Sequence, residues 1–216
     1  MGERGAQASG SIAPARAAPV IGSLGELWGY IREDHAVHAA SRREIAVLSP
    51  GFLALALYRV GVWANGLPRL PRAVVRRIVA VPPSFLRHAF RVSLYATASI
   101  GRRLKIVNHS GVIVHPWAVI GDDCLIRQGV TIGFAGDRGH DSVPRLGDRV
   151  SLGAGAVIAG AARIGDDVQI APNVVVMANV PAGSIVAPPP ARIMAPPPRK
   201  APAGPDAAAP HLRRVQ

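Results

Sequence analysis

The sequence is poor in cysteine and in aromatic residues, and both shortages exclude whole classes of protein. Cys124 is the one cysteine in 216 residues, so an internal disulfide framework is excluded and a reducing compartment, the cytoplasm, is indicated. Three Trp, three Tyr and four Phe are too few for the aromatic-interleaved basic motifs of single-strand nucleic-acid binders. We therefore expect no nucleic-acid partner.

Acidic residues are also scarce. Against 25 Lys and Arg there are 13 Asp and Glu, which gives a formal charge of +12 and a pI near 11.5. Such an excess makes an anionic partner the first hypothesis: nucleic acid, a membrane surface or a phosphorylated small molecule. Salt-dependent retardation of any DNA would revive the nucleic-acid alternative.

Long apolar runs are absent as well. Residues 1–20 contain none, so we expect a disordered N-terminus and not a signal peptide. The run 52–63 is too short to span a bilayer and is interrupted by Arg59. It is better interpreted as a core helix that packs on its neighbours or on another subunit.

An α-helical region is expected over residues 21–93. The spacing of apolar residues predicts a helix from about Leu24 to Ala40, and Ser49-Pro50 predicts the N-cap and first turn of a second helix that ends near Gly66. Residues 69–91 alternate Arg with aliphatic residues. They are either a solvated helix face or a peripheral membrane contact.

A period of six residues organises the chain from about Ile100 to Val186. Leading aliphatic residues fall at Val114, Ile120, Ile126, Ile132, Leu146, Leu152, Ile158, Ile164, Ile170 and Val176. Four positions after most of them comes a second small or aliphatic residue, from Ala118 to Val180. This period fits neither an α-helix nor an alternating strand.

Six residues make one short strand and a turn, and three such units make one coil of a triangular solenoid. The leading residue then points inward and stacks on its counterpart in the next coil, so that Val114 meets Ile132 and Leu146 meets Ile164. Gly-Asp-Asp and Gly-Asp-Arg, as in 121–123 and 147–149, supply the turns. Cys124 falls on an inward position, which indicates a buried small side chain and not a nucleophile.

The period is broken twice. The spacing is eight residues between Ile106 and Val114, beside His109, and fourteen between Ile132 and Leu146. Loops that leave a rigid scaffold commonly carry function. We therefore expect the β-helix domain at residues 94–187 to carry its site at these breaks, followed by a Pro/Ala/Arg-rich tail at 188–216.

Four motifs carry a family resemblance. Residues 50–61, 108–114, 128–133 and 190–193, within a likeness that covers about 31–193, resemble successive motifs of the serine O-acetyltransferases. These are hexapeptide-repeat acyltransferases. The fold that the resemblance implies is a left-handed parallel β-helix, mainly β, with N-terminal helices.

The implied activity is acetyl transfer from acetyl-CoA to a hydroxyl, at a site between subunits of a homotrimer. An alcohol attacks a thioester poorly unless a base takes its proton, and histidine is the usual base. His109 matches the family's catalytic histidine, with Asn108 beside it. His115 is interpreted as a turn residue. Whether Asn108, a backbone carbonyl or Asp141 orients His109 stays open.

The resemblance also implies where the ligands bind. Small residues are expected to let the coenzyme approach the groove between coils: Gly133, Ala135, Ala154 and Ala171. Arg145 or Arg163 could meet its phosphates. His140 and Asp141 in the second break are expected to bind the acceptor.

Several positions depart from the family. Asn108 and Leu94 stand where acidic residues are expected, and Val143 stands where a second histidine belongs, which His140 replaces only if the loop takes another path. The chain ends Arg214-Val215-Gln216 and not in the isoleucine that docks into a partner sulfhydrylase. An ammonium group needs such carboxylates when it is desolvated, so the sequence favours a neutral acceptor, a sugar or glycan precursor.

Two alternatives remain. One is an L-serine O-acetyltransferase of cysteine biosynthesis with a rearranged pocket. The other is a non-catalytic trimeric scaffold, or a zinc-dependent hydratase on the same solenoid. A zinc site needs three convergent ligands, and His109, His115 and His140 lack an obvious ligand spacing, so we expect no metal.

Overall fold

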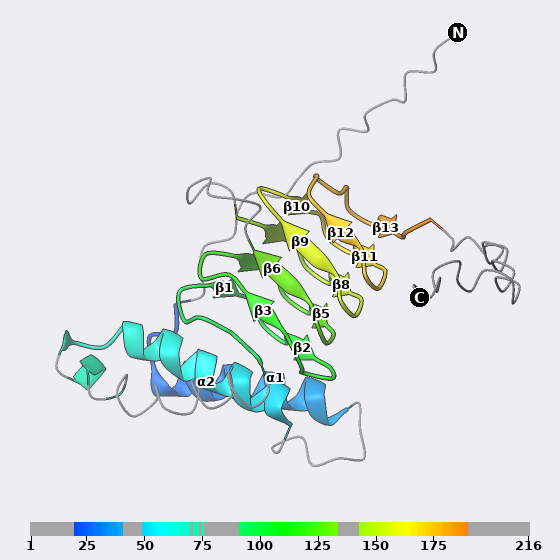
Figure 1. Ribbon diagram of the computed structural model, residues 1–216. Coiled ribbons are helices and arrows are strands. Elements are labelled where there is room, and N and C mark those ends of the chain that lie inside the picture. Colours follow the sequence, from blue (N-terminus) through cyan, green and yellow to red (C-terminus); the bar gives the residue numbers. More distant parts are fainter. Residues whose placement is uncertain are drawn as a thin grey trace, which may run out of the picture.

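The protein is a parallel β-helix with two α-helices packed at one end (Figure 1). The computed structural model describes residues 20–40, 49–69, 71–73, 75, 91–133 and 143–189. The helices are α1 (Leu24–Ala39) and α2 (Pro50–Asn65). The strands are β1 (Ser99–Ile100), β2 (Lys105–Ile106), β3 (Ile113–Val114), β4 (Val119–Ile120), β5 (Leu125–Ile126), β6 (Thr131–Gly133), β7 (Arg145–Leu146), β8 (Ser151–Leu152), β9 (Val157–Ala159), β10 (Arg163–Ile164), β11 (Gln169–Ile170), β12 (Val175–Val176) and β13 (Ile185–Val186).

The strands form three parallel sheets, one for each side of the triangular coil. The first sheet has the order β1-β4-β7-β10, the second β13-β11-β8-β5-β2 and the third β12-β9-β6-β3. Val114 pairs with Ile132 and Leu146 with Ile164, as the six-residue period predicts. The fold prediction, a β-helix preceded by helices, is confirmed.

The core is the column of inward side chains. Every leading aliphatic residue from Val114 to Val176 is buried, and so is every second position from Ala118 to Val180. Burying one such aliphatic side chain contributes roughly 1.5–3 kcal/mol. Cys124 is 1% exposed, and burial raises the pKa of its thiol to about 12, so it is a core residue as predicted.

The Gly-Asp-Asp and Gly-Asp-Arg segments form turns, as expected, and their glycines allow successive coils to approach closely. The left-handed conformation is adopted by the third turn residue, at Asp123 (φ 57°), Arg149 (φ 56°) and Asp167 (φ 59°). A Cβ on Gly121 would instead overlap the backbone of Gly147 in the next coil. Glycine is therefore required for the close approach of coils.

A ladder of aspartates joins these corners. Asp122 Oδ1 accepts a hydrogen bond from the Arg102 backbone N–H at 2.7 Å. Asp148 Oδ1 accepts from Asp122 N–H at 2.7 Å, and Asp166 Oδ1 accepts from Asp148 N–H at 2.8 Å. The Gly-Asp pairs thus satisfy backbone donors that the turns leave without a strand partner.

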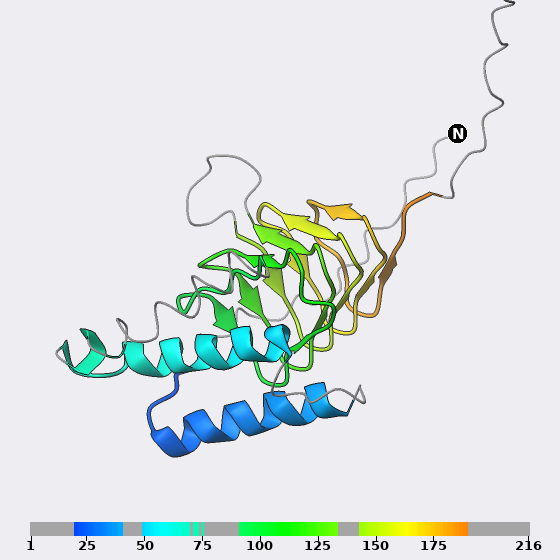
Figure 2. The ribbon, with the colours of Figure 1, turned by 60° about the horizontal axis from the view of Figure 1, so that its bottom comes forward.

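Both helices begin and end close to their predicted bounds. Before α1, Ser23 Oγ accepts from Glu26 N–H at 3.1 Å and the Glu26 carboxylate accepts from Gly22 N–H at 2.8 Å, a reciprocal cap. α2 begins with Pro50 and its N-cap residue is Ser49, as predicted, although the Ser49 side chain makes no capping hydrogen bond. Figure 2 shows the helices side by side and running in opposite directions.

The helices cover the β2 end of the β-helix. α2 buries Phe52, Leu55 and Tyr58, which confirms that the apolar run is a core helix. α1 buries Leu27 but leaves Trp28 62% exposed. Within the described ranges, neither helix combines the length and hydrophobicity that crossing a bilayer requires. Residues 1–19, 76–90 and the tail from residue 190 lie outside the described part of the chain.

Candidate active site

The first break in the repeat forms a turn that carries His109. Ile106 pairs with Ile126 and Val114 pairs with Ile132, so the eight-residue interval faces a six-residue one and two residues are extra. The Ser110 carbonyl accepts from Gly129 N–H at 2.8 Å, which anchors the turn to the next coil. The bulge that the spacing predicts is therefore present.

Asn108 and His109 differ in their surroundings within this turn. Asn108 is exposed and has a left-handed backbone (φ 52°), a conformation that asparagine tolerates better than most residues. His109 is half-buried, and this burial lowers the pKa of its imidazole below the usual value of 6.5. A lowered pKa keeps the ring neutral near pH 7, the form that can accept a proton.

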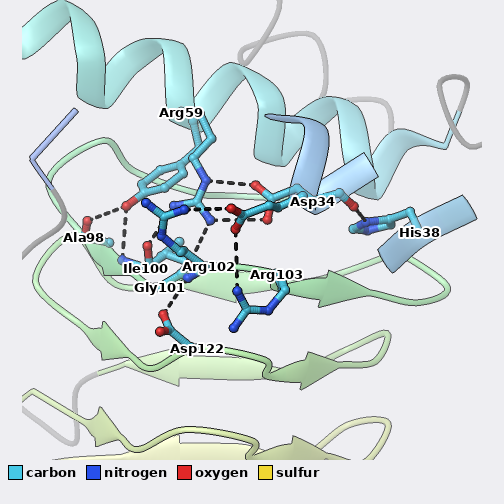
Figure 3. A network of polar contacts seen from close by, with 11 residues as sticks. Asp34, His38, Arg59, Ala98, Ile100, Gly101, Arg102, Arg103 and Asp122 are labelled. Atoms are coloured by element: carbon cyan, nitrogen blue, oxygen red, sulfur yellow. Dashed lines mark hydrogen bonds and ion pairs between the residues drawn. The ribbon is translucent and has the colours of Figure 1, made fainter. Parts of the chain in front are cut away.

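The strand that leads into this turn is held by both helices. His38 is buried on α1, and its Nδ1 donates to the Asp34 carbonyl at 2.7 Å (Figure 3). Its Nε2 accepts from Ile106 N–H at 3.2 Å. On α2, a Cβ added to Gly51 would lie 2.9 Å from the Ile106 carbonyl oxygen. Both helices therefore contact the backbone of β2, which ends three residues before His109.

A buried ion pair fixes the helices to the preceding strand. Arg59 Nε donates to Asp34 Oδ2 at 2.9 Å, and both side chains are almost fully buried. The remaining nitrogens donate to two carbonyls of the first coil, Ile100 at 2.8 Å and Gly101 at 2.5 Å (Figure 3). Arg59, which in the sequence only interrupts an apolar run, is the central residue of this junction.

Aromatic rings complete the junction. The Arg59 guanidinium lies 4.8 Å from the centre of the Tyr30 ring and 5.3 Å from that of Tyr58. The Tyr58 hydroxyl donates to the Ala98 carbonyl at 2.9 Å and accepts from Ile100 N–H at 3.1 Å. Because the buried side chains of Asp34, Tyr58 and Arg59 all have hydrogen-bond partners, the junction orders the first coil.

Acidification is expected to weaken this junction. Burial lowers the pKa of His38, and proximity to Lys105 and His35 acts in the same direction, whereas Asp34 opposes it. The unfolded chain therefore binds a proton first as the pH falls. The stability that His38 contributes is complete above about pH 6.5 and is lost as the pH falls from there towards the lowered pKa of the folded protein.

Urea unfolding between pH 7.5 and 5 measures this effect. The midpoint should fall with pH in the wild type and fall less in His38→Gln, whose amide can both donate to Asp34 and accept from Ile106 without titrating. His109 has a lowered pKa too, but it is present in both proteins. An equally steep decline in His38→Gln would contradict the assignment.

A groove runs along the second sheet, beside the His109 turn. Its volume is about 400 Å³, within the range of small-molecule sites. The groove is lined by Arg127, Gln128, Ser151, Gly153, Ala154, Gln169, Ile170, Ala171, Pro172 and Ile185. These residues lie in or directly after four neighbouring strands of the second sheet, β5, β8, β11 and β13, so the groove crosses successive coils.

The residues expected to bind coenzyme do not all lie in this groove. Ala154 and Ala171 line it, whereas Gly133 belongs to β6 in the third sheet. Arg145 and Arg163 lie on β7 and β10 of the first sheet and are not among the lining residues. Ala135, His140 and Asp141 lie outside the described residues.

Arg127 and Gln128 also line the groove, although the sequence did not lead us to expect them there. Gln128 begins one of the four motifs, but the motif by itself does not show which way its side chain points. Their position follows from the hydrogen bond that stacks Gly129 on Ser110. This bond brings the His109 turn next to the groove end that Arg127 and Gln128 form.

The other sequence candidates have structural roles. Leu94 packs against the core and Val143 is 4% exposed, so neither offers a polar group. His115 accepts from Trp117 N–H at 3.3 Å through Nδ1, and its carbonyl accepts from Ala118 N–H at 3.0 Å, as in a turn. Among the described residues, no three His, Cys, Asp or Glu side chains gather as metal ligands would.

Comparison with known sequences identifies relatives. Residues 144–180 match the family of bacterial transferase hexapeptide repeats (six repeats). The serine acetyltransferase of Helicobacter pylori is 36% identical over 154 residues, which are 71% of this chain and 85% of that protein.

Solved structures agree. Serine acetyltransferase from Brucella abortus strain S19 in complex with coenzyme A has a TM-score of 0.67 at 26% identity, over 79% of this chain and 68% of that one. Soybean serine acetyltransferase complexed with serine has a TM-score of 0.64 at 28% identity, over 76% of this chain and 68% of that one.

Proposed function

The chain belongs to the serine acetyltransferase family, and from this premise we propose that it transfers the acetyl group of acetyl-CoA to the side-chain hydroxyl of L-serine. That it is an acetyl-CoA-dependent O-acetyltransferase follows from its relatives. The observation that supports L-serine as the acceptor is the 36% identity over 85% of a protein named serine acetyltransferase. The expectation of a sugar acceptor rested on missing carboxylates, and the comparisons favour its serine alternative.

In the proposed reaction, His109 is the general base. Its neutral imidazole takes the proton of the serine hydroxyl as the oxygen attacks the thioester carbonyl. The tetrahedral intermediate then collapses, the carbon–sulfur bond breaks, and the imidazolium returns the proton to the leaving thiolate. The products are O-acetylserine and free coenzyme A. The lowered pKa of His109 supports this role.

The proposed coenzyme site is the groove beside the His109 turn. Ala154 and Ala171 have small side chains, which leave room along its wall for a pantetheine arm. Arg127 and Gln128 form the end of the groove next to that turn. Because this end adjoins the turn, a thioester in the groove can reach His109.

We place this enzyme in the cytoplasm as a homotrimer. Ile113 on β3 and Val175 on β12 are 46% and 62% exposed, and both strands belong to the third sheet. Such apolar side chains on one sheet are suited to contact with another subunit.

The experiment that tests the function measures release of free coenzyme thiol from acetyl-CoA. L-Serine should support turnover, whereas L-alanine, which lacks the hydroxyl, should not. A panel of sugars and nucleotide sugars is assayed beside them, and inhibition by L-cysteine would further mark the serine enzyme. Turnover with a sugar but not with serine would overturn the acceptor while leaving acetyl transfer intact.

A further inference from the structure

β2 is an edge strand of the second sheet, and one of its backbone donors depends on a side chain. The N–H groups of Lys105 and Val107 donate to backbone carbonyls of β5 at 2.9 Å. The N–H of Ile106, between them, points to the other edge of the strand, where it donates to His38 Nε2 at 3.2 Å. An edge that helices cover needs such a partner, because a buried N–H without an acceptor is costly.

His38 can accept this hydrogen bond in one protonation state only. The Asp34 carbonyl, which accepts at 2.7 Å, requires a hydrogen on Nδ1, and the Ile106 N–H requires a lone pair on Nε2. A protonated ring would carry a second N–H that is directed at the N–H of Ile106. His38 is 8% exposed and its ring centre lies 5.9 Å from that of Phe52, so water has little access to replace the lost bond.

Burial and the neighbouring charges keep this ring neutral near pH 7. Burial lowers the pKa of His38, and Lys105 on β2 and His35 on α1 act in the same direction. Asp34 opposes them, but its carboxylate is paired with Arg59 of α2 at 2.9 Å. The ring therefore gains its proton only below the ordinary histidine pKa of 6.5.

The same hydrogen bond lies next to the His109 turn. Ile106 is the last residue of β2, and two residues separate it from His109. Beyond His109, the Ser110 carbonyl accepts from the N–H of Gly129 at 2.8 Å. The turn is thus fixed by His38 through the strand at its start and by the next coil at its end.

Resting on the proposed function, we propose that His38 is a positioning residue for acetyl transfer: its neutral ring fixes Ile106 and thereby the His109 turn, and protonation of the ring releases the turn. His38 acts through the backbone and not on the substrates. Acid then inactivates the enzyme in two ways, by protonating the base and by protonating the residue that positions it. A base misplaced by about 1 Å can lose up to about 10²-fold in rate.

Three variants test the assignment at pH 7.5. His38→Leu, which can neither donate nor accept, should lower kcat about 10-fold and leave the KM values for acetyl-CoA and L-serine close to those of the wild type. His38→Gln should keep kcat, because its amide can make both hydrogen bonds. Val180→Ala, which truncates a buried side chain of the last coil, is the matched control and should lower the melting temperature but not kcat. A normal kcat in His38→Leu, or an equal loss in Val180→Ala, would overturn the proposal.

The pH profile separates a titrating positioning residue from a merely structural one. On the acid side, kcat/KM of the wild type should fall more steeply than the about tenfold per pH unit that a single protonation gives. In His38→Gln the slope should return to that of one proton, since only the base still titrates. The same profile in both proteins would contradict the role of His38.

Hydrogen exchange measured by mass spectrometry locates the effect without an assay. At pH 7.5, His38→Leu should exchange faster than the wild type in residues 104–112 and at the same rate in residues 163–176 of the distant coils. Exchange that rises equally in both segments would show general destabilisation and overturn the proposal. Exchange needs no substrate, so a wild type that does not acetylate serine, with a turn that loosens in His38→Leu, would remove the proposed acceptor and leave His38 in its positioning role.

Discussion

Replacing His109 with alanine is expected to lower kcat for acetyl transfer by about 10²- to 10⁴-fold, the contribution of a positioned general base. The side chain belongs to a two-residue bulge and is only half-buried, so its removal leaves the core column intact. Thiol release under saturating acetyl-CoA and L-serine measures the change. Circular dichroism and coenzyme A affinity should stay close to those of the wild type.

His115→Ala is the matched control for this prediction. His115 lies six residues further along and accepts from Trp117 N–H within its own turn. We expect its loss to change kcat by less than about threefold, since it only caps a turn. Near-wild-type turnover in His109→Ala, or an equal loss in His115→Ala, would contradict the assignment of His109 as the base.

The largest expected effect on stability comes from the buried ion pair. Arg59→Leu should lower the free energy of unfolding by about 3–5 kcal/mol, because it leaves the Asp34 carboxylate buried without its counter-charge. It also removes the donors to the carbonyls of Ile100 and Gly101. Urea unfolding at one protein concentration, followed by circular dichroism, measures the loss.

The double variant Asp34→Leu/Arg59→Leu separates charge from packing. Removing both charges should be less destabilising than Arg59→Leu alone, since no unpaired carboxylate remains. Arg59→Lys should recover only part of the stability, because an ammonium cannot reach Asp34, Ile100 and Gly101 in the same planar arrangement. Equal losses in the single and double variants would show that packing, and not the ion pair, governs the junction.

The helical region has a clear mechanical consequence for the site. His38 and Gly51 contact the backbone of Ile106, and Arg59 holds the carbonyls of Ile100 and Gly101, so both strands before the His109 turn are braced. A destabilised junction is thus expected to affect the turn before the distant coils. Figure 1 shows those coils leading away from the helices.

The local sequence was sufficient to predict the solenoid and the bulge. A period of six places each leading aliphatic residue inward whatever lies elsewhere in the chain, because each coil packs only on its neighbours. The extra residues between Ile106 and Val114 had to leave that register, which located His109. The bounds of α1 followed from the spacing of apolar residues, and those of α2 followed from Ser49-Pro50 and Gly66, in the same local way.

Contacts between segments that are distant along the chain could not be predicted from the sequence. Arg59 meets Asp34 across 25 residues, and Arg127 and Gln128 join Ala154 and Ala171 only because successive coils stack at one corner. The Gly-Asp segments predicted the turns, but only the approach of the next coil shows why glycine is required there. The sequence by itself determined the repeat, the helices and the position of the break, since short-range sterics and burial govern these. The tertiary structure alone decided which side chains form the junction and the groove, because these contacts depend on how coils and helices pack.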